Sequence, residues 1–323
     1  MLDNPPRSDA WDGESVWAAF RRTLGSFMTN EIPGAPLRIR IGTAEVDTTT
    51  DDEGYFEVRL QSPQGNFRGP WAEGDVSLSA PYRGITEDQS TAIRARIADP
   101  SAAFGVISDI DDTILHTGAQ RAAAMIRQTL TGSELTRIPF VGASELYQAL
   151  AASAPHGGNP IFYVSSSPWN LHGFLLNFLH HRRFPPGPLL LRDLLGNEVR
   201  RTHGSHKNAR IDEVLELHPD LSFILIGDSG QHDPEIYADV VKRHPGRILA
   251  VYIREVRLDP GDRRVEEITD TWSHDVPFGL VPTSSALARH AATLGLITPE
   301  DVTIVERAVN SGATDLSRCQ DGV

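Results

Sequence analysis

The chain has 323 residues, of which 40% are hydrophobic and 23% are charged, a composition typical of globular proteins. Its formal net charge of −13 argues against a nucleic-acid partner, because binding to a phosphate backbone depends on basic surface. The single cysteine, Cys319, excludes an intramolecular disulfide, and no secretory signal or apolar run of about 18 residues is visible, so we expect a cytoplasmic protein.

The first third of the sequence predicts an N-terminal helix segment followed by a β-sandwich domain. Within residues 1–34, SVWAAFRRTLGSFMTN (15–30) has apolar side chains at helical spacing. We expect this helix to pack on the protein's own core, with docking on a membrane as the alternative.

In residues 35–102 the apolar period changes to two, with turn signals between the segments. This pattern predicts a small antiparallel sandwich whose strands include LRIRIG (37–42), GYFEVRL (54–60) and AIRARIA (92–98).

Residues 103–323 have the pattern of an α/β domain. Continuous apolar segments alternate with helical ones, which predicts a parallel sheet covered by helices on both faces. The predicted strands are residues 104–108, 161–165, 188–192, 222–227 and 247–253. The predicted helices are residues 142–153, 168–181, 207–217, 234–244, 284–294 and 299–309. Thr298 and Asp301 flank Pro299 in a capping-box pattern that marks the start of the last helix.

Polar residues follow the ends of three predicted strands. The segments are DIDDT (109–113), SSS (165–167) and GDSGQHD (227–233). Between them, Lys207 opens a predicted helix. Each feature alone has an ordinary explanation, since Ser167 and Asp233 precede prolines as helix N-caps do, and Lys207 fits an exposed helix lysine.

Together these residues provide what phosphoryl transfer needs. The reaction requires a nucleophile, an acid for the leaving oxygen, a divalent cation and donors for the phosphoryl oxygens. Asp109 and Asp111 are two residues apart in an extended segment, so both can face a pocket at the sheet edge where ligands bind. Asp228 and Asp233 add hard oxygen ligands of the kind that Mg²⁺ prefers. The predicted phosphate donors are Ser165, Lys207 and the amides that open the helix after Ser167.

The ordered set of motifs resembles the haloacid dehalogenase superfamily of phosphohydrolases. The motifs are Asp109-x-Asp111-x-Thr113, Ser165, Lys207 and Gly227-Asp228-x-x-x-x-Asp233. Longer strings, among them SDIDDTI, YVSSSPWNL, HKNARI and IGDSGQHDPEIY, resemble the catalytic domain of the actin-patch-associated phosphatidate phosphatase family over residues 104–255. The resemblance implies a Rossmann-like parallel sheet of the haloacid dehalogenase type. Because only short segments, residues 114–160 and 166–206, follow the first two motifs, we expect no large cap and an open site suited to a bulky substrate.

The resemblance also implies a role for each site residue. Asp109 is the nucleophile that forms an aspartyl-phosphate, Asp111 is the general acid and base, and Lys207 stabilises the charged intermediate. The implied cofactor is Mg²⁺. Its implied ligands are Asp109, the carbonyl of Asp111 and Asp228, and Asp233 is either a further ligand or the partner of Lys207. The implied phosphate-binding residues are Ser165, Ser166 and Thr113.

The activity implied by the resemblance is Mg²⁺-dependent hydrolysis of phosphatidate to diacylglycerol. Two alternatives stay open: a phosphatase for a soluble phosphomonoester or phosphoprotein, and a catalytically inactive lipid-binding adaptor. The implied partner is a phosphorylated lipid or another phosphomonoester. The segment between residues 180 and 210 contains seven basic residues and two acidic ones. This segment fits either a peripheral contact with an anionic membrane or a solvated loop whose arginines pair with acids elsewhere.

Overall fold

The structure is a computed structural model that describes residues 32–52, 54–60, 67, 70–85, 89–97, 99–110, 140–153, 158–192, 203–255 and 263–320. The predicted helix over residues 15–30 lies outside the described residues, as do Asp111 and Thr113. Within the described part, no helix combines the length and the apolar character that crossing a membrane requires.

The larger body of the protein is an α/β domain built on a six-stranded parallel sheet, which confirms the predicted sheet. Its strands are β5 (Gly105–Asp109), β6 (Ile161–Pro168), β7 (Leu189–Arg192), β8 (Phe223–Asp228), β9 (Ile248–Arg254) and β10 (Phe278–Val281). The order across the sheet is β10-β9-β8-β5-β6-β7, and every neighbouring pair is parallel. Five of these strands correspond to predicted ones, whereas β10 has no predicted counterpart.

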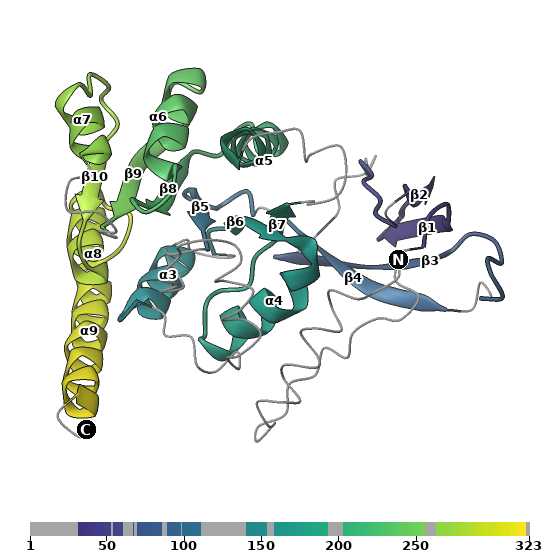
Figure 1. The fold of residues 1–323 in the computed structure, drawn as a ribbon, viewed down its shortest axis with the longest axis horizontal. Helices are drawn as coiled ribbons and strands as arrows, with labels where there is room; N and C mark the ends of the chain where they lie inside the picture. The colour runs from purple at the N-terminus through teal and green to yellow at the C-terminus, as the bar shows by residue number, and fades with distance from the viewer. Residues whose placement is uncertain are drawn as a thin grey trace.

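Helices cover both faces of this sheet (Figure 1). On one face lie α3 (Ala143–Ala152), α4 (His172–His181) after the short turn η2 (Trp169–Leu171), α8 (Ser284–Thr293) and α9 (Pro299–Gln320). On the other face lie α5 (His203–Leu217), α6 (Asp233–Arg243) and α7 (Arg264–Asp270). Each face encloses its own hydrophobic core, which includes Tyr147 and Leu287 on the first face and Val214 and Tyr237 on the second.

The two central strands determine which face each site residue occupies. Every residue of β5 and of β8 is buried, as expected for strands covered on both sides. Successive side chains alternate between the faces, so Val106 packs in the first core and Ile107 in the second. By the same alternation, Ser108 lies on the α3 face and Asp109 lies on the face covered by α5 and α6.

The segment before this domain contains a four-stranded antiparallel sheet. Its strands are β1 (Pro36–Ile41), β2 (Ala44–Thr49), β3 (Trp71–Leu78) and β4 (Ser90–Arg96), in the order β2-β1-β3-β4. Leu37 and Ile39 alternate into its core, as the LRIRIG pattern predicts, and β4 corresponds to the predicted AIRARIA strand. The described residues of this segment form one sheet, so the second sheet of a sandwich is not seen among them.

The predicted strand over residues 54–60 is wrong. These residues form no strand, and Phe56 is exposed. A turn at Asp51 engages both backbone groups of Tyr55. The Tyr55 amide donates to the Asp51 carboxylate (2.9 Å), and its carbonyl accepts the Asp51 amide (2.8 Å). Backbone groups held in a local turn cannot join a strand ladder, although Val58 and Leu60 still pack against the core of the antiparallel sheet.

Two predicted helix starts have different outcomes. The helix predicted over residues 168–181 starts later, because β6 continues through Pro168, which pairs with Arg192 of β7, and α4 begins only at His172. The N-cap interpretation of Ser167 is therefore wrong. The capping box at α9 is confirmed, since the Thr298 amide donates to the Asp301 carboxylate (2.9 Å) and the Asp301 amide donates to the Thr298 hydroxyl (3.2 Å).

The basic segment between residues 180 and 210 is not a uniformly exposed surface. Arg192 and Lys207 are buried. Arg210 forms an ion pair with Glu213 (2.9 Å), whereas Arg183 is exposed after the end of α4. The described residues of this segment therefore do not form a continuous basic patch for an anionic membrane.

Candidate active site

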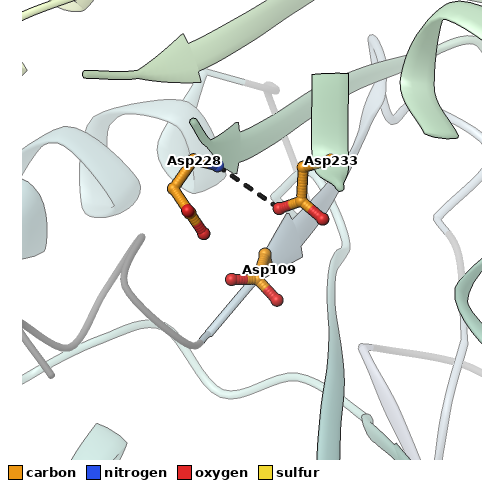
Figure 2. A group of neighbouring side chains, drawn as sticks. All are labelled: Asp109, Asp228 and Asp233. Carbon is orange, nitrogen blue, oxygen red and sulfur yellow. Dashed lines mark hydrogen bonds between the residues drawn. The ribbon is translucent and has the colours of Figure 1, made fainter. Parts of the chain in front are cut away.

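Three carboxylates meet at the carboxyl edge of the parallel sheet and form what we call the acidic cluster. Asp109 ends β5, Asp228 ends β8, and Asp233 begins α6. One carboxylate oxygen from each lies within 4.8 Å of the others, and all three residues are fully buried. Figure 2 shows the three side chains directed toward one another. The structure therefore places these predicted residues at the edge where ligands bind in open parallel sheets.

Lys207 of α5 is the counterion of the acidic cluster. Its ammonium lies 2.8 Å from an oxygen of Asp109 and also donates to Asp233, and its side chain is 3% exposed. Burial alone would lower the pKa of Lys207, but the charges of Asp109 and Asp233 outweigh burial and raise the pKa above its ordinary value. Lys207 is therefore charged at neutral pH, and the interpretation of it as an exposed helix lysine is wrong.

The charge of this group of residues fits a divalent cation. Among the residues that the structure describes, these three buried carboxylates and the Lys207 ammonium sum to a charge of −2, and buried charge is unfavourable unless it is compensated. The donors are all carboxylate oxygens, which suit a hard cation such as Mg²⁺ better than a softer metal. The residues present thus fit a single divalent cation held by Asp109, Asp228 and Asp233.

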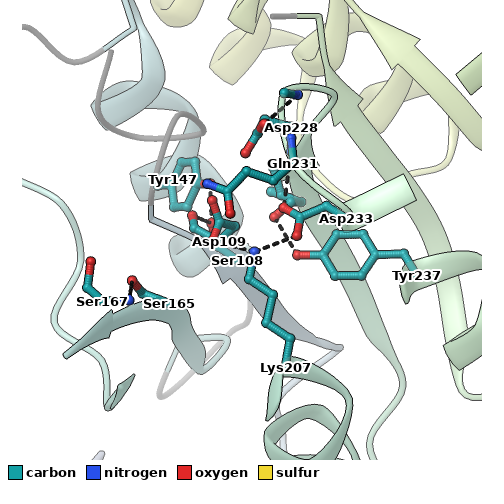
Figure 3. Close-up of polar contacts among 12 residues, drawn as sticks. Ser108, Asp109, Tyr147, Ser165, Ser167, Lys207, Asp228, Gln231, Asp233 and Tyr237 are labelled. Atoms are coloured by element: carbon teal, nitrogen blue, oxygen red, sulfur yellow. Dashed lines mark hydrogen bonds and ion pairs between the residues drawn. The ribbon is translucent and has the colours of Figure 1, made fainter. Parts of the chain in front are cut away.

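The loop after β8 holds the carboxylate of Asp228 in place (Figure 3). One oxygen of Asp228 accepts hydrogen bonds from the amides of Gly230 (2.7 Å) and Gln231 (3.1 Å). The Asp228 amide in turn donates to Asp233 (3.3 Å). Asp233 uses its carboxylate for Lys207 and the Asp228 amide, and no side chain caps α6, so the N-cap interpretation of Asp233 is wrong.

Gly227 is needed because Asp233 approaches the backbone closely at this point. A Cβ atom at position 227 would lie 2.5 Å from the nearer Asp233 carboxylate oxygen and 2.7 Å from the ring of Tyr237. Any side chain there would displace Asp233 from Lys207. The glycine that begins the GDSGQHD segment thus has a steric role in the site.

The hydrogen-bonded pair of Ser108 and Tyr147, next to Asp109, was not predicted from the sequence. The Ser108 hydroxyl donates to the backbone carbonyl of Asp109 (2.7 Å) and lies 2.5 Å from the hydroxyl of Tyr147 on α3. Burial raises the pKa of Tyr147, so its hydroxyl remains protonated and can donate to Ser108. These contacts fix the end of β5 from the face opposite Lys207. The sequence carried no signal for Tyr147 beyond its apolar helix position.

The serine triplet lies on the neighbouring strand, on the other side of β5 from β8. Ser165 is fully buried, and its hydroxyl accepts the Ser167 amide (2.9 Å), whereas Ser166 is partly exposed. Figure 3 shows Ser165 and Ser167 at the end of β6, away from Asp228. The order β8-β5-β6 places Asp109 between the two groups. The structure thus gathers Asp109, Lys207, Asp228 and Asp233 at one place and leaves Ser165 and Ser166 on the neighbouring strand.

Arg264 of α7 was also not predicted, and it holds the loop that positions Asp228. Its guanidinium donates to the carbonyls of Gln231 (3.0 Å) and Ser229 (3.1 Å). Outer residues that orient metal ligands typically contribute 10–100-fold to metal affinity. We expect Arg264→Met to weaken binding of Mg²⁺ or Mn²⁺ about 10-fold, measured by isothermal titration calorimetry.

The matched control for that change is Arg289→Met. Arg289 forms an exposed ion pair with Glu306 (2.9 Å) on the face of α8 and α9, away from the loop. This variant should bind the cation as the wild type does. Equal cation affinity in the Arg264 and Arg289 variants would show that the loop does not depend on Arg264.

Comparisons with known proteins match the segment that carries these residues. The family described as "Phosphatidate phosphatase APP1, catalytic domain" matches residues 104–255. The chain is 30% identical over 242 residues to the phosphatidate phosphatase APP1 of Saccharomyces cerevisiae, covering 72% of this chain and 40% of that protein. It is 25% identical over 223 residues to an uncharacterized protein of Schizosaccharomyces pombe, covering 67% of this chain and 35% of that protein. The chain thus spans less than half the length of either relative.

The matched segment runs from the start of β5 to the end of β9, and it contains the acidic cluster, Lys207 and the serine triplet. The segment that is similar to the family is therefore the segment that contains the candidate active site. Residues 104–255 belong to the family of the phosphatidate phosphatase APP1 catalytic domain.

Proposed function

We propose that this protein is a Mg²⁺-dependent phosphatase of the haloacid dehalogenase type that hydrolyses phosphatidate to diacylglycerol. The observation that carries the proposal is the buried cluster of Asp109, Asp228 and Asp233 around the Lys207 ammonium. A cluster with net negative charge, a cationic neighbour and a nucleophilic carboxylate has the components of a phosphoryl-transfer site. The relative named a phosphatidate phosphatase supports the choice of lipid substrate.

Asp109 is the proposed nucleophile. Its carboxylate lies 2.8 Å from the Lys207 ammonium, which can offset the charge of a phosphoryl group transferred to it. The oxygen of Asp109 attacks phosphorus, the bond from phosphorus to the lipid oxygen breaks, and water then hydrolyses the aspartyl-phosphate. Asp111, outside the described residues, is the proposed donor of the proton to the leaving oxygen and acceptor of the proton from water.

The other residues bind and orient the substrate. Asp109, Asp228 and Asp233 would hold Mg²⁺, which stabilises negative charge on the phosphoryl oxygens when it is bound. Ser165, Ser166 and Thr113 are the proposed phosphate-binding residues. Because the lipid substrate lies in a bilayer, we propose a cytoplasmic protein that contacts membranes peripherally.

The test is a substrate panel with and without Mg²⁺. The wild type should release phosphate from phosphatidate in mixed micelles, and excess chelator should lower the rate at least about 100-fold, with recovery on addition of Mg²⁺. Sugar phosphates, nucleotides and phosphopeptides complete the panel. Activity on these soluble compounds but not on phosphatidate would overturn the lipid substrate, and full activity in chelator would overturn the metal. Binding to phosphatidate vesicles without any turnover would indicate a lipid-binding adaptor.

A further inference from the structure

Arg254 is a buried cation at the same edge of the sheet as the acidic cluster. It ends β9 and is 5% exposed. Its Cα is in register with that of Asp228 on the neighbouring parallel strand, and residues in register point to the same face of a sheet. The Arg254 side chain therefore leaves the sheet on the same side as the Asp228 side chain, one strand farther from β5.

The guanidinium of Arg254 has few polar partners for its degree of burial. It stacks on the ring of Phe140, with 3.5 Å between the guanidinium carbon and the ring centroid, and one nitrogen lies 3.4 Å from the Ser284 hydroxyl. Among the described residues, no carboxylate lies within 4.0 Å of it. A guanidinium has five N–H donors, and buried arginines are rare unless they are paired. Stacking covers one face of the group but leaves its in-plane donors available.

Arg247, directly before the same strand, is held mainly by backbone carbonyls. One of its nitrogens donates to the carbonyls of Leu215 (3.1 Å), His218 (2.6 Å) and Leu221 (2.9 Å). Arg254 has no such set of carbonyl acceptors among the described residues. The arginines before and at the end of β9 therefore differ, and among the described residues Arg254 has the Ser284 hydroxyl as its one hydrogen-bond acceptor.

Arg254 nevertheless stays charged. Burial lowers its pKa to about 10, and nearby Tyr147 and Asp228 oppose that shift. At neutral pH the group thus carries a full positive charge in a desolvated position. An incoming anion at this position would gain a charge-assisted hydrogen bond without competition from bulk water.

We propose that Arg254 binds an oxygen of the substrate's phosphate group, from the side of the site opposite Ser165. The proposal rests on the proposed function, since it needs a phosphate ligand. With one divalent cation bound, the acidic cluster and Lys207 are neutral as a group, so these residues alone offer a phosphomonoester dianion no net positive charge. Arg254 adds that charge. Two strand spacings, about 10 Å, separate β9 from β5. Arg254 leaves the sheet toward the α8 face and Asp109 toward the α5 face, so the phosphate would lie between them at the carboxyl edge of the sheet.

Inorganic phosphate is the probe for this proposal. At saturating Mg²⁺, Arg254→Met should weaken phosphate binding about 10–100-fold, measured both as the inhibition constant and by calorimetry on the resting protein. Arg254→Lys should recover part of this affinity, because it keeps the charge but loses the planar pair of donors. The Arg254→Met variant should unfold at the same or a higher temperature than the wild type, because it removes a buried charge that has no carboxylate within 4.0 Å in the described part of the chain.

Arg247→Met, at the residue directly before β9, is the matched control. It should lower the unfolding temperature and leave the phosphate affinity unchanged, because its contacts are with backbone carbonyls. Vesicles of phosphatidate in neutral lipid form a second arm, which shows whether the same residue acts on the lipid headgroup.

Three outcomes would overturn the proposal. Phosphate affinity could be unchanged in Arg254→Met. The variant could lose Mg²⁺ affinity while phosphate binding at saturating Mg²⁺ is kept, which would make Arg254 a positioning residue for Asp228. It could instead lose stability as the Arg247 variant does, with no specific loss of phosphate binding. Calorimetry with phosphate gives an answer even if the wild type hydrolyses no phosphomonoester, so failure of the proposed function is recognised separately.

Discussion

The Asp109→Asn variant is expected to lose at least about 10³-fold in turnover while it keeps its fold. An amide cannot attack phosphorus as a carboxylate does, so the first bond-forming step is lost. The fold should tolerate the change because Lys207 keeps its contact with Asp233. Removing one of three buried negative charges also reduces repulsion, so without metal the variant should unfold at the same or a higher urea concentration than the wild type.

The measurement combines phosphate release with urea unfolding followed by circular dichroism. Asp212→Asn is the matched control, because Asp212 also lies on the α5 side but pairs at the surface with Arg243 and His244. That variant should keep its turnover. Wild-type turnover in Asp109→Asn would end the assignment of the nucleophile, whereas a loss of folding would show that Asp109 has a structural role.

The parallel sheet could be predicted from sequence because its central strands are buried on both faces. FGVIS, SFILIG and RILAVYI are continuous apolar runs, and they match β5, β8 and β9 closely. β10 has only four residues and is half-buried at the sheet edge, so it has no comparable pattern. The strands β2 and β3 were missed for a related reason, since few of their side chains are fully buried.

The positions of the site residues could be predicted because topology brings the carboxyl ends of parallel strands together. Once β5 and β8 are adjacent, Asp109 and Asp228 must lie close to each other. The contact of Lys207 with both Asp109 and Asp233 depends on how α5 packs, which no local pattern reports. The wrong N-cap interpretation of Ser167 has a similar cause. A serine followed by a proline is typical of a helix start, but here the strand continues through Pro168.

The residues that support the site could not be predicted from sequence. Tyr147 has the apolar helix position of an ordinary core residue, and Arg264 belongs to RVEEITD, which resembles a solvated helix. Arg254 looks like the charged residue that often ends a strand. Their roles depend on contacts with Ser108, the loop after β8 and Phe140, which are distant in sequence.

The Lys207→Met variant is expected to lose both turnover and stability. Removing one partner of a buried ion pair costs about 3–5 kcal/mol, because the other charge is left without compensation. Here the loss leaves three buried carboxylates with no ammonium among them. The folded protein holds Lys207 at a raised pKa, so its stabilising effect is complete below the ordinary pKa of 10.5 and is lost only at higher pH. The difference in unfolding free energy between variant and wild type should therefore persist across the neutral range.

A divalent cation should reverse part of the instability of Lys207→Met, because it replaces positive charge inside the acidic cluster. We expect Mg²⁺ to raise the unfolding free energy of the variant more than that of the wild type, measured by urea unfolding in chelator and in excess Mg²⁺. The control is Lys242→Met on the exposed side of α6, which should change neither stability nor turnover. Equal responses of Lys207→Met and the wild type to Mg²⁺ would show that the cation does not bind among these carboxylates. An unchanged stability in chelator would show that Lys207 is not their counterion.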